Sequence, residues 1–352
     1  MASQPAPHVE CLPQAWTGMM LLDSTDGSEL IWSRGESGEQ WAPDLYGFTP
    51  GASTPSLIYR DPNRNAQLNT IAVHRGRYAF EELFTNKDGT SGWRLWFIAS
   101  KGSAPIVLDS NADDPQGLPV PGIVAAFTDE QVTWNTVHSV KGQVFWSLRS
   151  YTFSTKTTRT LVEAPETATE FWFPNADDRG RLVYATVEYG PDRQTKTAAY
   201  HVYIANLTDN PLQPRRLDSD GLATEPVLSD GDTVVWKTVD PSMSIATWGS
   251  LYRFSLSGRQ EHQISFDDQT MLDYHSAGNR YVVGWESNAT SFNAYDLETD
   301  TSLWIEKHEP TSTVGAHMAV VSEDMVVFIR ADDSLPGGKN KWLCYAKLPP
   351  HT

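Results

Sequence analysis

Short apolar runs separated by polar turns follow one another along the whole chain. In Leu228–Asp240 ("LSDGDTVVWKTVD"), Asp230-Gly231-Asp232 divides two such runs, and the second ends in Val234-Val235-Trp236. Asp-Gly between alternating apolar positions is typical of a β-hairpin. No segment shows helical periodicity over a useful length, so the pattern predicts an all-β protein.

The hairpin recurs along the chain with successive spacings of 43 to 54 residues. Each copy carries an aromatic residue near the end of its second strand: Trp32, Phe80, Trp134, Tyr184, Trp236, Trp285 and Phe328. A second strand–turn–strand unit follows each hairpin, as in Ser250–Ser265. Four short strands in each repeat predict a β-propeller, because a four-stranded sheet alone cannot bury both of its faces, whereas packed sheets bury one another.

We therefore predict an all-β fold, a seven-bladed β-propeller of four-stranded antiparallel blades that forms a single domain over residues 1–352. The predicted blades span about 16–60, 68–109, 121–163, 169–218, 223–266, 271–307 and 316–348 plus 8–14.

The last repeat ends before a fourth strand can form. The segment His8–Gln14 occupies the position of a strand before the first hairpin, so we expect it to add to the last blade as its outer strand and to close the ring. This arrangement brings Cys11 beside Cys344 and predicts a disulfide, which by chain entropy would add about 4 kcal/mol or more to stability. The alternative is two unrelated buried thiols.

The stretch "LSDGDTVVW…GSLYRFSLSGRQEHQIS" resembles the repeats of TolB-type propellers. Blades of that family share the Ser-Asp-Gly turn, the aliphatic-aromatic strand and a hairpin of the form (L/I)Y-x-x-x-x-x-G, and Trp93–Ser110 is similar. The resemblance implies the fold. Such blades occur in periplasmic binding proteins, peptidase gating domains, lyases and surface proteins, so the function has to be inferred from a site.

Acidic residues outnumber basic ones by 44 to 27, and the formal charge is −17. A surface of this sign argues against nucleic acid and anionic membranes as partners, and fits a cationic partner or a neutral substrate. The chain contains no apolar run of transmembrane length and no nucleophile elbow, zinc-protease motif, phosphate loop or complete calcium-binding loop. No cofactor is evident from these motifs, although a cation in the central channel is compatible with the fold.

Ligands of propellers usually bind where the loops between blades surround the channel, on the face away from the Asp-Gly turns. Aligning the innermost strands places one tier of residues near this channel mouth: Trp16, Asn69, Ile123, Glu170, Glu225, Asp273 and His317. If the protein is an enzyme, the candidate catalytic residues are Glu170, Glu225 and His317, as an acid/base pair or as metal ligands. The alternative is that these polar groups satisfy the ends of strands.

Tryptophans form a second candidate set, in or beside the connections between second and third strands: Trp41, Trp93, Trp146 and Trp248, on the same face as Trp16. Exposed indoles near carboxylates and amides suit stacking against a sugar or clamping a peptide. With Asn69 and Asp273 these five tryptophans are the predicted ligand-binding residues. The alternative is that some of them pack between blades.

These features favour an extracytoplasmic ligand-binding propeller that presents an aromatic and acidic loop face to a carbohydrate or protein partner. The alternative is a carbohydrate-active hydrolase or lyase with its active site at the channel mouth, and a third reading is an assembly scaffold with a broad apolar patch. The start of the chain lacks the pattern of a signal peptide. We expect an extracytoplasmic location, with the signal absent from this chain, if the two cysteines are bonded, and a cytoplasmic location if they are free.

Overall fold

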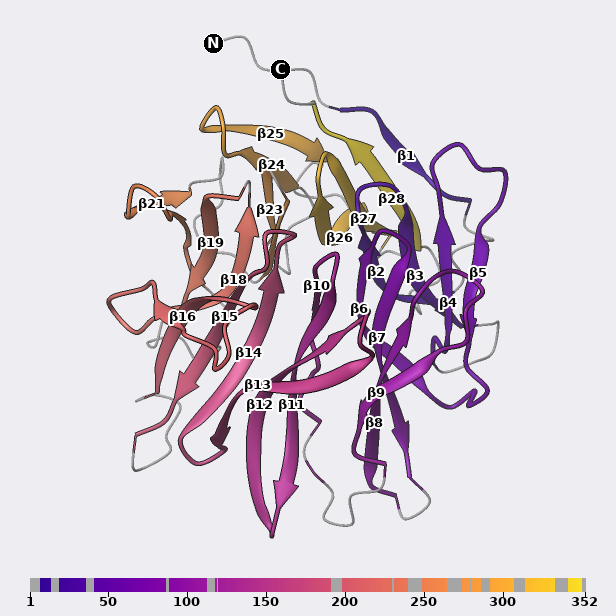
Figure 1. The fold of residues 1–352 in the computed structure, drawn as a ribbon. Coiled ribbons are helices and arrows are strands. Elements are labelled where there is room, and N and C mark those ends of the chain that lie inside the picture. Colours follow the sequence, from indigo (N-terminus) through magenta and orange to yellow (C-terminus); the bar gives the residue numbers. More distant parts are fainter. Residues whose placement is uncertain are drawn as a thin grey trace. The chain divides into compact units, whose positions relative to one another are not determined.

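A computed structural model describes residues 7–13, 19–35, 41–86, 89–112, 118, 120–190, 198–229, 231–239, 249–264, 274–278, 280–285, 292–306, 314–332 and 341–349. These residues form strands, turns and connecting segments (Figure 1). Within them, no helix has the length and apolar character needed to cross a membrane.

The strands form seven four-stranded sheets, and six of the seven follow chain order from the first strand to the fourth. The first sheet holds β2 (Met19–Thr25), β3 (Leu30–Gly35), β4 (Asp44–Phe48) and β5 (Ser56–Arg60). The second holds β6 (Gln67–His74), β7 (Arg77–Thr85), β8 (Ser91–Ile98) and β9 (Ile106–Ser110). The third holds β10 (Ala125–Phe127), β11 (Gln131–Val140), β12 (Gln143–Thr152) and β13 (Thr157–Pro165). The next three are β14 (Thr169–Ala176), β15 (Arg181–Glu188), β16 (Ala199–Asn206) and β17 (Arg215–Arg216); β18 (Ala223–Ser229), β19 (Thr233–Thr238), β20 (Leu251–Ser255) and β21 (Gln260–Ile264); and β22 (Tyr274–Ala277), β23 (Tyr281–Trp285), β24 (Phe292–Asp296) and β25 (Thr301–Glu306). The seventh holds β26 (Val314–Ser322), β27 (Met325–Asp332), β28 (Lys341–Lys347) and β1 (Val9–Cys11). The predicted all-β class and the seven four-stranded blades are confirmed.

Contacts divide the chain into two compact units. Unit one comprises Met1–Arg64, Ser229–Val235 and Met243–Thr352, and unit two comprises Asn65–Leu228 and Trp236–Ser242. Unit one therefore contains the sheet that joins the two ends of the chain, and unit two contains the complete sheets β6–β9, β10–β13 and β14–β17.

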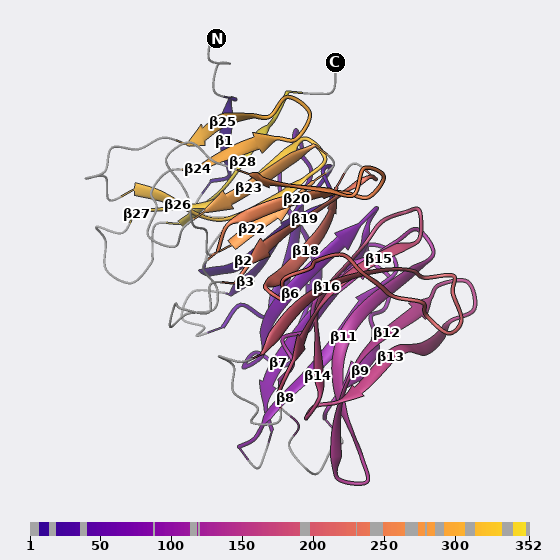
Figure 2. The same ribbon diagram turned by 90° about the vertical axis from the view of Figure 1, so that its left-hand side faces the viewer.

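In unit one, the amino-terminal strand completes the last sheet as predicted. β1 pairs antiparallel with β28 in the register that sets Cys11 opposite Cys344, and the two sulfurs are bonded at 2.04 Å. The backbone amide of Leu12 continues the ladder to the carbonyl of Leu343 at 2.9 Å, and the Tyr345 hydroxyl donates to the Glu10 carboxylate. The predicted outer strand and disulfide are both confirmed. Figure 1 shows β1 beside β28, and Figure 2 shows the same fold turned by 90°.

The recurring hairpin aromatics fill the cores of both units. In unit one, Trp32 and Phe328 are fully buried among apolar residues of the neighbouring sheets. In unit two, Phe80 and Trp134 are fully buried, and the Trp134 indole nitrogen donates to the Asp109 carboxylate at 2.9 Å. The repeat aromatics are thus core residues, because inward-facing positions of each sheet pack against the next sheet.

Turn residues of the repeated hairpin have structural partners. The Asp232 carboxylate accepts hydrogen bonds from the Ser257 amide at 3.0 Å and from the Ser255 hydroxyl at 2.9 Å. It thereby links the turn between β18 and β19 to the turn between β20 and β21. Asp232 lies in the hairpin of Leu228–Asp240, where the Asp-Gly pattern predicts the turn.

Among the strand pairings that the structure describes, the first strands of four sheets carry a bulge. In β2, β6, β14 and β26, one extra residue lies opposite the second strand, as between Leu68 and Ile71 and between Trp172 and Asn175. A bulge changes which face of the sheet the following side chains point to. Three of the channel-mouth candidates, Asn69, Glu170 and His317, lie on bulged strands.

Candidate functional site

The channel-mouth residues of the second and third sheets are joined by a buried carboxylate. The Asn69 side-chain amide donates to Glu81 at 2.6 Å, and the backbone amide of Ile123 donates to the same carboxylate at 3.1 Å. Glu81 is fully buried, and this burial raises its pKa above the ordinary value. Asn69 and Ile123 thus connect the first strand of one sheet to the segment before the next sheet through Glu81. This agrees with the alternative that polar groups at these positions satisfy the ends of strands.

The two candidate catalytic glutamates each have partners in their own sheets. Glu170 accepts hydrogen bonds from the Trp172 indole at 2.9 Å and from the Tyr189 hydroxyl at 3.1 Å. The Glu225 carboxylate lies 2.7 Å from the ammonium of Lys237, whose side chain is fully buried. The backbone of Glu225 adopts a left-handed φ of 50°. Burial raises the pKa of Glu225, against the opposing effect of the Lys237 charge.

The remaining channel-mouth predictions fall largely outside the described side chains. His317 lies on β26 opposite Ile329, immediately before the bulge, and its side chain is not described. Trp16, Trp248 and Asp273 lie outside the described residues. The catalytic role of Glu170, Glu225 and His317 stays a prediction.

The tryptophan prediction is wrong for two of the described residues. Trp93 is 0% exposed and Trp146 is 4% exposed, so neither presents an indole to a ligand. Both belong to the core of unit two, where the Trp146 ring lies 4.7 Å from the ring of Trp172. The space between packed sheets accepts these large apolar rings, as the alternative reading allowed. Trp41 is 36% exposed, and its role in binding stays a prediction.

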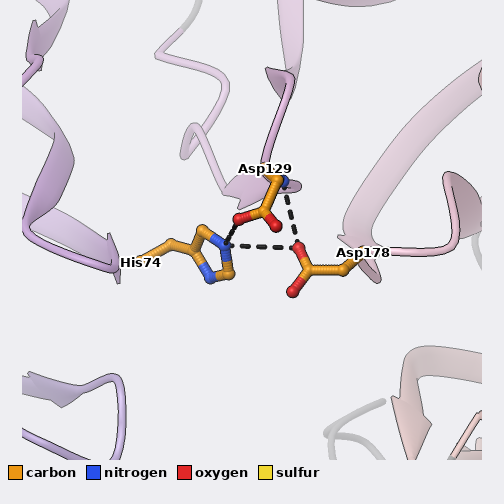
Figure 3. Close-up of side chains that lie close together, drawn as sticks. All are labelled: His74, Asp129 and Asp178. Atoms are coloured by element: carbon orange, nitrogen blue, oxygen red, sulfur yellow. Dashed lines mark hydrogen bonds and ion pairs between the residues drawn. The ribbon is translucent and has the colours of Figure 1, made fainter.

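A cluster of charged side chains joins three hairpin turns in unit two (Figure 3). His74 ends β6, Asp129 and Asp178 lie in the turns after β10 and β14, and Figure 3 shows the imidazole facing both carboxylates. The His74 Nε2 atom lies 3.1 Å from Asp129 and 3.3 Å from Asp178. The neighbouring Arg75 also donates to both carboxylates, at 3.1 Å to Asp178.

The charges of this cluster favour a structural role, in which ion pairs hold the three turns together. A hydrogen bond from His74 holds the pKa of Asp129 below its ordinary value, and the charge of Arg75 adds to the effect. One histidine and two carboxylates could in principle bind a metal ion, but Arg75 already supplies positive charge to both carboxylates. The sequence analysis placed the hairpin turns on the face away from the expected ligand and missed this convergence, although the turns occupy the same position in three successive repeats.

A pocket of about 420 Å³ opens beside the ends of strands in the second and third sheets. It is lined by Arg77, Phe97, Ala99, Ala104, Ile106, Tyr151, Phe153 and Lys156. These residues lie at the start of β7, the end of β8, the start of β9 and the end of β12, and in the two turns that follow β8 and β12. The pocket is therefore at the hairpin-turn ends of the strands, not at the ends that the sequence favoured for a ligand.

Three of the eight residues that line the pocket are aromatic. The rings of Phe97 and Phe153 stack with centroids 5.2 Å apart and planes within 5° of parallel. The Arg77 guanidinium lies over the Phe153 ring, 4.8 Å from its centroid. Phe127 packs near both phenylalanine rings, with centroids 6.3 and 6.4 Å apart, and stacks on His74, so ring contacts connect the pocket residues to the charged cluster.

No family model and no curated protein matches the chain. Among solved structures, the β-propeller domain of the Trilobed protease from Pyrococcus furiosus matches with a TM-score of 0.60 at 11% identity, over 88% of each chain. A prolyl endopeptidase matches with a TM-score of 0.60 at 14% identity, over 94% of this chain and 48% of its own. A puromycin-hydrolysing peptidase from Mycobacterium tuberculosis matches with a TM-score of 0.53 at 14% identity, over 97% of this chain and 55% of its own.

The chain is a seven-bladed β-propeller. At these identities the likeness shows the fold alone, and this propeller spans about half the length of the last two structures. The three structures named here are a propeller domain of a protease and two peptidases. A specific relation to TolB-type propellers stays a prediction.

Proposed function

We propose that this chain is an extracytoplasmic ligand-binding propeller and that the pocket lined by Phe97, Phe153 and Ile106 is its ligand site. The lining of the pocket is the observation that carries the proposal. Small-molecule sites are concave, mostly apolar and supplied with a few polar groups, and a volume of about 420 Å³ lies in their usual range. Ile106 remains 41% exposed, so the pocket keeps apolar surface in contact with water.

The chemistry of the lining favours a protein or peptide partner over a carbohydrate. A sugar ring presents many hydroxyl groups, and burying them requires hydrogen-bond partners. Apart from the Tyr151 hydroxyl and the two cationic side chains, the lining side chains are hydrocarbon, and none carries a carboxylate or carboxamide. A large apolar side chain from a partner would lose no such hydrogen bonds in this pocket.

The disulfide supports the extracytoplasmic part of the proposal. The chain has two cysteines, and they are bonded to each other. Disulfides form and persist in oxidising compartments and are rare in cytosolic proteins.

Ligand-observed NMR with 3-phenylpropanol, a neutral aromatic probe, tests the pocket directly. We expect saturation transfer from the wild-type protein to the probe and its loss in Ile106→Asp, which places a charge on the pocket wall. The matched control is Leu57→Asp, because Leu57 is 42% exposed and also lies on the fourth strand of its sheet. Transfer that is absent in the wild type, or equally reduced by both substitutions, would refute the proposal.

One observation favours the hydrolase alternative. Burial raises the pKa of Glu225, and carboxyl groups of raised pKa serve as general acids in glycosidases. The alternative is a structural role, in which the Glu225 carboxylate forms an ion pair with the buried Lys237. An assay of the wild type with an oligosaccharide panel separates the two, since turnover that disappears in Glu225→Gln while the fold is retained would favour the hydrolase.

A further inference from the structure

Two cations at the pocket are the starting point of a more specific inference. Arg77 and Lys156 both line the pocket of a protein whose formal charge is −17. Within the described part of the chain, neither side chain forms an ion pair, and the Arg77 guanidinium lies over an aromatic ring instead. Lys156 is exposed, in the turn after β12. Cations placed beside an apolar pocket complement an anion attached to an apolar group.

The edge of the neighbouring sheet provides the second observation. β9 is the outermost strand of its sheet, and Ile106 at its start lines the pocket. Ile106 and Val107 are 41% and 46% exposed, so consecutive apolar residues of both faces of this strand meet solvent. An exposed outer strand can accept an extended peptide as an additional strand.

We propose that this site binds the carboxyl-terminal end of a peptide whose last residue has a large apolar side chain. That side chain occupies the pocket against Phe97 and Phe153, and the terminal carboxylate pairs with Arg77 and Lys156. The residues before it extend along β9. The inference rests on the proposed function, because it assigns a ligand to the same pocket.

The direction of β9 selects the carboxyl end of the peptide. β9 begins at Ile106, beside the pocket, and runs away from it to Ser110. A strand added antiparallel to β9 therefore runs toward the pocket and ends there. A strand added parallel to β9 would instead begin at the pocket and present its positively charged amino end to Arg77 and Lys156, which repel it.

Fluorescence anisotropy with a labelled hexapeptide, Gly-Ser-Val-Thr-Val-Phe, tests the inference. The label is attached at the amino end, and the carboxyl end is left free in one peptide and amidated in the other. We expect the free carboxylate to bind at least ~10-fold more tightly, since it forms charge-assisted hydrogen bonds that the amide cannot form. Equal binding of the two peptides would overturn the inference.

Substitutions of Arg77 and Lys156 test whether these side chains cause the preference for a free carboxyl end. In Arg77→Met and Lys156→Met we expect most of the difference between free and amidated peptide to disappear. Lys141→Met is the matched control, because Lys141 is also exposed, lies in the turn at the end of the preceding strand and has a φ of 53° against 55° for Lys156. A preference that survives both pocket variants, or that Lys141→Met removes equally, contradicts the inference.

The two proposals fail in distinguishable ways. If 3-phenylpropanol binds in an Ile106-dependent manner while the hexapeptide shows no preference for a free carboxylate, the pocket is a ligand site and the peptide-end inference is wrong. If 3-phenylpropionate binds as tightly as the hexapeptide, addition to β9 is wrong. If neither the alcohol nor the peptide binds, both proposals are wrong.

Discussion

Removing the disulfide between Cys11 and Cys344 should destabilise the protein strongly. The bond closes a loop of 333 residues. The chain-entropy relation gives about 6 kcal/mol for a loop of this length, and native disulfides usually contribute about 2–5 kcal/mol. With an unfolding entropy of about 2.1 cal/mol/K per residue, a loss of 5 kcal/mol in a chain of 352 residues lowers the melting temperature by roughly 7 °C if the chain unfolds in one transition.

Three samples separate the covalent link from the packing of the sulfur atoms. Differential scanning calorimetry is run on the oxidised wild type, on the wild type reduced with a phosphine, and on the Cys11→Ala/Cys344→Ala double variant. Reduction keeps the sulfur atoms and removes the link, so we expect it to account for most of the shift. A shift below about 2 °C in the reduced protein would show that the link does not restrain the unfolded chain as this reasoning requires.

Three further predictions concern charged groups. Glu225→Leu should destabilise the protein by about 3–5 kcal/mol in urea denaturation, because it leaves the fully buried Lys237 ammonium without this carboxylate. Lys237→Met should destabilise it less, because the Glu225 side chain that it leaves behind is 20% exposed and can be hydrated. Burial raises the pKa of Glu81 in the folded state, so its contribution to stability is present below its ordinary pKa of 4.5 and is lost as the pH rises through the folded pKa. The unfolding free energy of the wild type relative to Glu81→Gln should therefore fall from pH 4 to pH 8, and a flat difference would contradict this sign. Arg75→Ala should lower the free energy of unfolding by less than about 1 kcal/mol, because Arg75 is 62% exposed and pairs with exposed carboxylates, and in 1 M salt this loss should vanish. A larger loss that does not depend on salt would contradict the assignment of these groups as a weak surface ion pair.

The fold was predictable because its signals are local and repeated. Alternation of polarity identifies a strand, Asp-Gly identifies a turn, and the recurrence of both every fifty residues or so identifies blades. The last repeat has only three strands of its own, and this shortage is enough to locate β1 and the partner of Cys11. The strands and turns depend on neighbours in sequence, and the pairing of β1 with β28 follows from the count of strands in each repeat.

The candidate site was less predictable, because the sequence marks neither the exact ends of the strands nor the positions of bulges. Trp93 and Trp146 lie beside loops in the sequence, yet they point into the core of unit two. A bulge after Leu68 shifts the pairing of β6 by one residue, and no motif in the sequence marks it. One residue of shift moves every later side chain of a strand to the opposite face.

The sequence by itself determined the class of fold, the number of blades and the closing of the last sheet by the first strand. Only the tertiary structure decided which side chains share a pocket. Arg77 and Phe153 are ordinary strand-end residues of different repeats, and their contact at 4.8 Å appears only once the two sheets pack. The physical reason is that periodic alternation specifies which face of a strand is buried, whereas a binding site depends on the packing of side chains from separate repeats.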